Sequence, residues 1–309
     1  MKKQTILTRD SSGLILALCL FNIIGTCLTM ADSPEQFRAA AILGDATAQY
    51  NLGICYFKGT GVTQDYVEAV KMFRRAANQG LAEAQCYLGY CYDHGKGIAE
   101  NKGEAVKWYF KAAVQEEPNA QCDLGKCFYS GSGVTQDRAE AVKWFHKAAD
   151  QGNANAQFNL GNCYDQGTGV TTDKAEAVRW FLKAAAQGSD EAQYNLSLHY
   201  HDGDGVAEDK AEAVKWARMS ATQGYANAQR DLGIYYYNGT GVTQDKAEAV
   251  KWFQKAAAQG LAGGQYNLGL CYAYGEGVGQ DKVEAAKWLR KASDQGYADS
   301  AEELRKLEQ

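Results

Sequence analysis

The fold is decided by a stretch of 36 residues, 224–259, which reads GYANAQRDLGIYYYNGTGVTQDKAEAVKWFQKAAAQ. The same pattern runs through most of the chain. With Gly44 as position 1, position 9 is Leu and positions 16 and 18 are Gly in seven consecutive units, and all 6 tryptophans stand at position 29. Repetition at this period is typical of solenoids built from small helical units. The units span residues 44–79, 80–115, 116–151, 152–187, 188–223, 224–259 and 260–295.

Each unit predicts two helices joined by a turn. Apolar or small residues at positions 5, 9, 12 and 13 form one face of a first helix at helical period. Gly-x-Gly ends this helix, because only Gly enters left-handed backbone geometry without penalty. A pair such as Asp245-x-x-Glu248 is typical of a capping box at the start of a second helix. The sequence therefore predicts an all-α fold, a right-handed α/α superhelical solenoid of helix-turn-helix repeats.

The two ends of the array predict half-repeat caps. Residues 34–43 follow the second-helix pattern, with Ser33 as a plausible N-cap and Pro34 at the first helical position. Residues 296–309 follow the first-helix pattern and keep Leu304, but charged residues surround it, as a terminal cap requires. Because one helix pair cannot bury both of its faces, we expect residues 32–309 to form a single solenoid.

Residues 1–31 predict a targeting segment. Lys2, Lys3 and Arg9 precede an apolar stretch, and small residues follow it at 29–31, which is typical of a secretory signal peptide. Two alternatives stay open: a membrane anchor formed by residues 13–30, and lipid attachment at Cys27. We expect an exported protein, whether periplasmic, secreted or membrane-anchored, whose contact with a membrane is limited to residues 13–30 if they are retained.

The overall charge argues against nucleic-acid binding. The 309 residues include 32 Lys and Arg against 37 Asp and Glu, a formal net charge of -5, whereas binding to phosphates needs a basic surface. Hydrophobic residues make up 46% of the chain, which is typical of a packed protein and too apolar for disorder. We therefore expect no nucleic-acid partner.

The sequence offers no recognisable catalytic, metal or cofactor site. His199-x-His201 places its rings on different sides of a helix, and Gly-x-Gly lies in a helix–helix turn rather than after a strand. Signatures of common hydrolases are absent from the sequence. We therefore expect a protein without enzymatic activity, metal or cofactor.

The cysteines of the repeats predict buried thiols rather than disulfides. Equivalent positions in neighbouring units should lie about 8–10 Å apart, beyond the reach of a disulfide. Five cysteines stand at position 12 and two at position 7, namely Cys55, Cys91, Cys127, Cys163 and Cys271, and Cys86 and Cys122.

Residues 46–53, Ala-Thr-Ala-Gln-Tyr-Asn-Leu-Gly, together with Gly59-Thr60-Gly61-Val62 and residues 248–257, resemble the Sel-1-like repeat family, a relative of the tetratricopeptide repeats. The resemblance covers residues 33–309 and implies an α-solenoid that acts as an adaptor for other proteins. Three departures from the family pattern predict looser packing: Glu116-Glu117-Pro118, Ser197 in place of Gly, and Ala217 in place of an aromatic residue.

The candidate binding residues lie on one arc of the first helices, at positions 4, 7, 8, 11, 14 and 15, opposite the buried arc. In tetratricopeptide relatives this arc lines a concave groove, where amides and tyrosines suit a peptide ligand. The candidates are Tyr50, Asn51, Ile54, Phe57, Tyr90, Tyr129, Phe158, Asn159, Tyr194, Asn195, Tyr237, Tyr266 and Asn267. The alternative is that these residues descend from one duplicated unit and that the position-7 aromatics pack against a neighbouring helix.

These observations favour a non-enzymatic adaptor or scaffold that binds a protein or peptide in the groove of the first helices. Two other functions stay open. One is an exported effector that engages a host protein. The other is a hydrolase of β-lactam or cell-wall substrates, as in cysteine-rich relatives, although the cysteine positions and the missing Ser-x-x-Lys argue against it.

Overall fold

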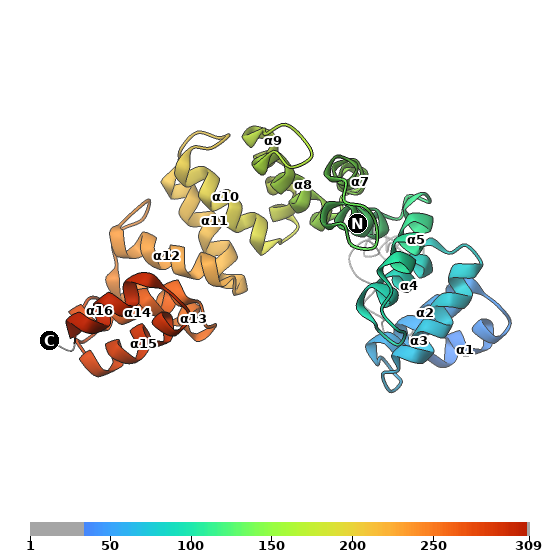
Figure 1. Ribbon diagram of the computed structural model, residues 1–309, viewed down its shortest axis with the longest axis horizontal. Helices are drawn as coiled ribbons and strands as arrows, with labels where there is room; N and C mark the ends of the chain where they lie inside the picture. Colours follow the sequence, from blue (N-terminus) through green and yellow to red (C-terminus); the bar gives the residue numbers. More distant parts are fainter. Residues whose placement is uncertain (1–33, 308–309) are drawn as a thin grey trace, which may run out of the picture. The chain divides into compact units, whose positions relative to one another are not determined.

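The computed structural model describes residues 34–307, which form 16 α-helices and no strand (Figure 1). The targeting segment and Ser33 lie outside the described residues. The helices are α1 (Pro34–Ile42), α2 (Ala46–Lys58), α3 (Tyr66–Asn78), α4 (Ala82–His94), α5 (Lys102–Ala113), α6 (Pro118–Ser130), α7 (Arg138–Asp150), α8 (Ala154–Gln166), α9 (Lys174–Ala186), α10 (Asp190–Asp202), α11 (Lys210–Gln223), α12 (Ala226–Asn238), α13 (Lys246–Ala258), α14 (Ala262–Tyr274), α15 (Lys282–Asp294) and α16 (Ala298–Leu307).

The chain divides into two compact units, one ending at Glu100 and the other beginning at Asn101. The first unit contains α1 to α4 and the second contains α5 to α16. Within each unit, successive helices pack side by side, as the coloured ribbons in Figure 1 show. The prediction of an all-α repeat solenoid is confirmed.

In the turn between the two helices of a repeat, the glycine that ends the first helix adopts the predicted conformation. The predicted capping box at the start of the second helix forms only in part. Gly239 ends α12 in the left-handed region, with φ 73°, and donates its N–H to Tyr235. Asp245 caps α13 by accepting the N–H of Glu248 at 2.9 Å. The second hydrogen bond of a capping box, from the Asp245 N–H to the Glu248 side chain, is replaced, because the Asp245 N–H donates to the carbonyl of Tyr236 on the first helix. The Glu248 side chain pairs with Lys251 instead.

A glycine at position 10 lets the two helices of a repeat approach closely. A Cβ added to Gly233 would lie 2.5 Å from the ring of Phe253, so only Gly tolerates an aromatic residue at position 30. In the fifth repeat both partners change together, to Ser197 and Ala217. Both residues are fully buried, and Ala217 shares a hydrophobic cluster with Tyr235, which is itself almost fully buried. The Ser197 and Tyr235 hydroxyls lie 3.4 Å apart. The looser packing expected here is not seen, since both positions are fully buried and Tyr235 lies in the same cluster as Ala217.

The third departure, at Glu116, changes the backbone rather than the core. Glu116 is the one non-glycine residue with positive φ among those described, and its φ of 67° lies in the region that glycine occupies in the other repeats. Glu117 then caps α6 through the N–H of Ala120, and Pro118 begins that helix. The chain therefore keeps the turn at the cost of local strain.

Buried glutamines connect each repeat to the one before it. Gln121 is almost fully buried, accepts from Nε2 of Gln151 at 2.8 Å and donates to the carbonyl of Ala113 in the preceding repeat at 3.2 Å. The donor stands at position 36 and the acceptor at position 6 of the same repeat. The amide pairs are Gln79–Gln49, Gln151–Gln121, Gln187–Gln157, Gln223–Gln193, Gln259–Gln229 and Gln295–Gln265.

Candidate binding face

The candidate residues lie on what we call the first-helix face, the arc formed by positions 4, 7, 8, 11, 14 and 15 of each first helix. In the second unit this face carries three hollows at equivalent places. Hollow A lies between α6 and α8, hollow B between α8 and α10, and hollow C between α12 and α14. Each is lined by position 14 of one repeat and by positions 8 and 11 of the next. The repeat geometry therefore places like positions around like cavities.

Hollow A has a volume of about 400 Å³, and three amide side chains contribute to its lining. Tyr129 forms one wall, packs against Phe145 at 6.5 Å between ring centroids and lies under the guanidinium of Arg138 at 5.6 Å. The Lys126 ammonium is paired with Asp123 at 2.9 Å. The full lining is Lys126, Tyr129, Ser130, Phe145, Asn159, Asn162 and Gln166.

Hollow C has a volume of about 290 Å³, and no charged side chain lines it. Tyr237 stands where Tyr129 stands in hollow A, and the Lys246 ammonium lies 4.8 Å from the centre of its ring. Ile234, Leu270 and Phe253 add apolar surface. Asn238, Asn267 and Cys271 complete the lining.

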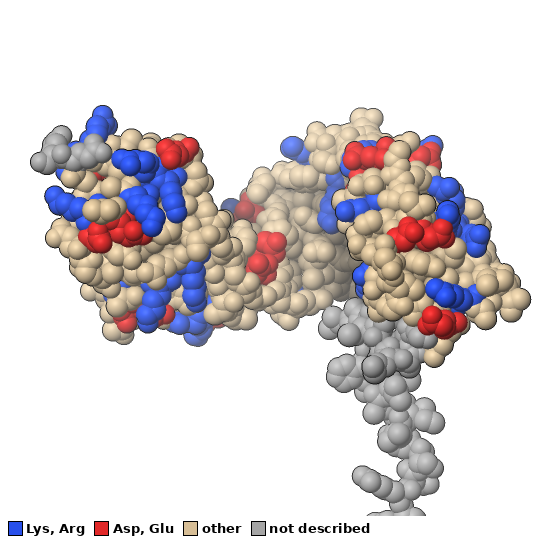
Figure 2. Space-filling model, turned by 90° about the horizontal axis from the view of Figure 1, so that it is seen from below, with Lys and Arg blue, Asp and Glu red and all other residues tan. Residues whose placement is uncertain are grey.

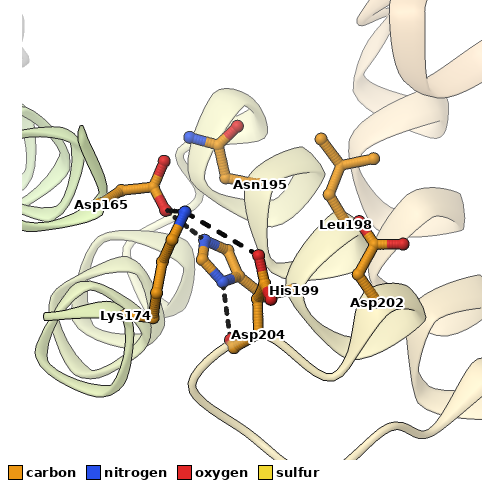
Figure 3. Close-up of a pocket in the computed structure, with 7 residues that line it drawn as sticks. All are labelled: Asp165, Lys174, Asn195, Leu198, His199, Asp202 and Asp204. Carbon is orange, nitrogen blue, oxygen red and sulfur yellow. Dashed lines mark hydrogen bonds and ion pairs between the residues drawn. The ribbon is translucent and has the colours of Figure 1, made fainter. Parts of the chain in front are cut away.

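Hollow B, about 190 Å³, is the most polar of the three, and it is drawn in Figure 3. Lys174 from the start of α9 lies 2.8 Å from a carboxylate oxygen of Asp165, and this hydrogen bond raises the pKa of Lys174. The hollow is lined by Asp165, Lys174, Asn195, Leu198, His199, Asp202 and Asp204.

The buried His199 joins both sides of hollow B. Its Nδ1 lies 2.8 Å from the backbone carbonyl of Asp204, and its Nε2 lies 3.2 Å from Asp165. Because a carbonyl can only accept, Nδ1 carries a proton and donates it to that oxygen. Asp202 and Asp204 stay at the rim, with side chains 61% and 56% exposed.

The junction between α10 and α12 is occupied by the protein's own side chains. The hydroxyl of Tyr194 donates to Asp231 at 3.0 Å, and its ring packs against Tyr225 at 5.2 Å. Burial, reinforced by the Asp231 charge, raises the pKa of Tyr194. The ring of His201 stacks on Tyr235 at 5.5 Å. His199 and His201 thus point into different junctions, as their spacing predicts.

The position-7 aromatics mostly serve the packing of the solenoid. Like Tyr194, Tyr266 packs on the segment that follows its repeat, here the C-terminal cap, where it contacts Tyr297 at 4.8 Å. Phe158 packs on Phe181 of its own repeat at 6.0 Å. These contacts favour the alternative interpretation at position 7. The amides at position 8 remain half-exposed at the hollows, although Asn195 also donates to Asn162 at 3.1 Å.

In the first unit the aromatic candidates pack against one another. Phe57 contacts Tyr66, Tyr87 and Tyr90 at 5.1–6.0 Å, and Tyr50 contacts Phe73 and Tyr87. Tyr90 stacks on His94 at 4.1 Å.

One candidate of the first unit needs correction. Ile54 is only 4% exposed, so it belongs to the core and not to a binding surface, because α2 turns this position toward its neighbours. Asn51 is half-buried.

The seven cysteines of the described chain are buried thiols, as the sequence predicts. Burial raises the pKa of Cys91 to about 12 and those of Cys163 and Cys271 to about 11. Between residues 34 and 307, no group of His, Cys, Asp and Glu side chains is arranged to hold a metal ion. Over the same range, no helix is both long and apolar enough to cross a membrane.

The charges on the surface are mixed in sign. Figure 2 shows Lys and Arg side chains next to Asp and Glu side chains on one face, with wide areas of uncharged residues between these groups. The visible face therefore carries no continuous basic surface.

Sequence reasoning missed four polar residues that line hollow B. Asp165, His199, Asp202 and Asp204 come from positions 12 to 17 of two repeats, and only folding brings them together. For hollow A, the variation at position 11, where Lys126 and Asn162 stand, was the available signal.

Comparison with known proteins shows the same repeats. The Sel1 repeat family model matches residues 46–81, 82–115, 118–153, 154–189, 190–225, 226–261 and 262–297. The chain is similar to a protective antigen present in uropathogenic Escherichia coli strains that displays an SLR fold, with 39% identity and a TM-score of 0.82. The match covers 89% of this chain but only 59% of the antigen. A Sel1 repeat protein from Oxalobacter formigenes is 40% identical, with a TM-score of 0.71 and coverage of 89% of this chain and 79% of that protein. No curated protein matches the chain.

Proposed function

The chain belongs to the Sel1 repeat family, and we propose that it is a non-enzymatic adaptor that binds an extended segment of a partner protein along the first-helix face of its second unit. Solenoids of this kind are typical protein-interaction scaffolds, because stacked repeats present an extended surface. This chain covers only 59% of the longer E. coli antigen.

The recurrence of the three hollows, each with an asparagine from position 8, supports the proposal. Asn159, Asn195 and Asn267 stand at hollows A, B and C. A side-chain amide donates and accepts hydrogen bonds, so a row of amides matches the alternating N–H and C=O groups of an extended peptide. The cavities beside them would take the peptide's side chains.

Photo-cross-linking in the native cell tests this proposal. A photoreactive amino acid placed at Ser130 in hollow A should cross-link a partner, whereas the same group at Asp150, at the exposed end of α7, should not. Equal cross-linking from both places would contradict the assignment of the face. Mass spectrometry of the product identifies the partner.

The identified partner then allows a quantitative test. Asn159→Ala and Asn267→Ala each remove about one hydrogen bond, so each should weaken binding about fivefold. Asn78→Ala is the matched control, because this exposed amide lies at the end of α3, away from the first-helix face. Unchanged binding in both groove variants would exclude the amide row as the ligand site.

We also propose that residues 1–31 direct export, because a basic start precedes an apolar stretch and small residues. Sequencing the amino terminus of the protein recovered from its native cell should yield Asp32. A terminus at Met1 would favour a retained anchor, and a lipid on Cys27 would favour the third alternative.

Purified protein should hydrolyse no chromogenic β-lactam, and turnover would contradict the non-enzymatic assignment.

A further inference from the structure

We infer that the partner segment carries a basic side chain that enters hollow B and an apolar side chain, about six residues away, that enters hollow C. This inference rests on the proposed binding function and specifies its ligand. It follows from the different chemistry of hollows that occupy equivalent places in the repeats.

Hollow B has an excess of negative charge. Three aspartates line it against Lys174 and His199. Lys174 lies 2.8 Å from Asp165 and 3.8 Å from Asp204, and His199 Nε2 lies 3.2 Å from Asp165, so both basic side chains are already engaged. Asp202 contacts His201 through one oxygen at 2.9 Å. A carboxylate has about four acceptor sites, so Asp202 and Asp204 keep oxygens for a further donor at the exposed rim. A guanidinium or ammonium group matches this charge and geometry.

Hollows A and C lack this preference. In hollow A the one cation of the lining, Lys126, is compensated by Asp123 at 2.9 Å. Hollow C has Ile234, Leu270 and Phe253 in its wall and no charged residue in its lining. The nearby Lys246 ammonium is compensated by Glu276 at 2.8 Å. Placing a charged side chain there would remove its hydration without providing a partner, so hollow C selects an apolar side chain.

The closed junction between hollows B and C sets the spacing. Tyr194, His201 and Tyr235 fill the α10–α12 junction, so the ligand must pass over one repeat without inserting a side chain. Packed helices lie about 8–10 Å apart, which places the two hollows roughly 20 Å apart along two repeat steps. An extended chain advances about 3.3 Å per residue, so roughly six residues separate the basic and apolar side chains.

A peptide-display selection on the full-length protein tests the inference. The probe is a library of random peptides of about twelve residues, long enough to span both hollows. We expect selected peptides to share Lys or Arg about six residues from Leu, Ile or Phe. Their binding should weaken as salt rises, because the rim carboxylates are solvent-exposed.

Matched variants separate charge recognition from other effects. With Asp202→Asn/Asp204→Asn as bait, the basic residue should disappear from the selected peptides while the apolar residue remains. The wild-type peptides should bind this variant about tenfold or more weakly. Asp150→Asn/Asp294→Asn removes the same charge from the exposed ends of α7 and α15, and its selected peptides should match those of the wild type. Circular dichroism checks that each bait is folded.

The outcomes distinguish this inference from the proposed function. Peptides that bind the first-helix face, as judged by loss of binding on Asn159→Ala/Asn267→Ala, but lack a basic residue would overturn the inference and leave the adaptor proposal standing. A basic preference that persists with Asp202→Asn/Asp204→Asn would overturn it as well. If no peptide is enriched on any bait, both the inference and the peptide-binding proposal fail.

Discussion

The Nε2 of Gln187 donates a hydrogen bond to the side-chain oxygen of Gln157 at 2.8 Å, and Gln157 in turn donates to the backbone carbonyl of Ala149 in the preceding repeat at 3.1 Å. Gln157 is only 4% exposed. This relay satisfies polar groups in the interface between repeats, where unpaired groups would be costly. It also requires that neighbouring repeats adopt one register.

Breaking the relay should destabilise the second unit. Gln157→Leu removes both hydrogen bonds of the relay, which should cost about 1–3 kcal/mol, although the Gln187 amide keeps its bond to the Gly152 carbonyl and the Ala149 carbonyl still accepts from the Gly152 N–H. Urea unfolding followed by tryptophan fluorescence measures the change. Gln254→Leu, on the exposed side of α13, should stay within about 0.5 kcal/mol of the wild type. An equal effect of both substitutions would show that the relay contributes nothing specific.

Relieving the strained backbone at Glu116 should stabilise the protein. Glu116→Gly places glycine at φ 67°, and the gain from lost strain should exceed the extra chain entropy of glycine by about 0.5–1 kcal/mol. Gly152→Ala is the reverse control, since a Cβ at Gly152, with φ 90°, would meet no atom within 4 Å. It should lower stability by strain alone. Thermal unfolding checks both, and a destabilised Glu116→Gly would refute the strain argument.

The changed core residues Ser197, Ala217 and Tyr235 should affect stability in a coupled way. Ala217→Phe should cost about 1–3 kcal/mol, because Ser197 and Tyr235 leave no space for the ring. Adding Ser197→Gly and, in the sixth repeat, Tyr235→Cys should recover most of the loss. The three changes restore the glycine and phenylalanine of the first and third repeats and the cysteine of the repeat that follows each. Calorimetry of the single, double and triple variants measures the coupling. Additive effects would mean that the three positions do not share one space.

The buried thiols should make stability fall at alkaline pH. Cys91 keeps its proton in the folded chain up to a pKa of about 12, whereas an exposed thiol has a value of 9.0. A raised folded pKa contributes stability that is complete below pH 9 and is lost as pH rises from 9 toward 12. The unfolding midpoint should therefore decline above pH 9, and Cys91→Ala should make that decline shallower. An identical pH profile for this variant would contradict burial of the thiol as the cause.

Much of the fold could be predicted from the sequence, because its determinants lie close together in the chain. Leu232, Gly239 and Asp245 define a buried face, a left-handed turn and a helix start within a single repeat. Ile54 shows where this local reasoning fails. A helical wheel assigns it to the first-helix face, but its exposure depends on the helices that surround α2.

The binding face, like the fold, could be predicted from the sequence only in part. Position-8 asparagines and position-14 tyrosines could be selected from the sequence, and the structure places Tyr129 with Asn159 and Tyr237 with Asn267 in shared hollows. For Tyr194 the sequence left packing and ligand binding both open, and only the structure decides for packing, because Asp231 and Tyr225 belong to the next repeat.

The sequence alone determined the repeat, its helices and its membership of a solenoid class, since hydrophobic period, glycine turns and helix caps act over a few residues. Only the tertiary structure decided which cavities stay open and what charge they carry. Asp165 and His199 stand 34 positions apart in the chain and meet at 3.2 Å because α8 and α10 stack, and stacking is a property of neighbouring repeats rather than of either one.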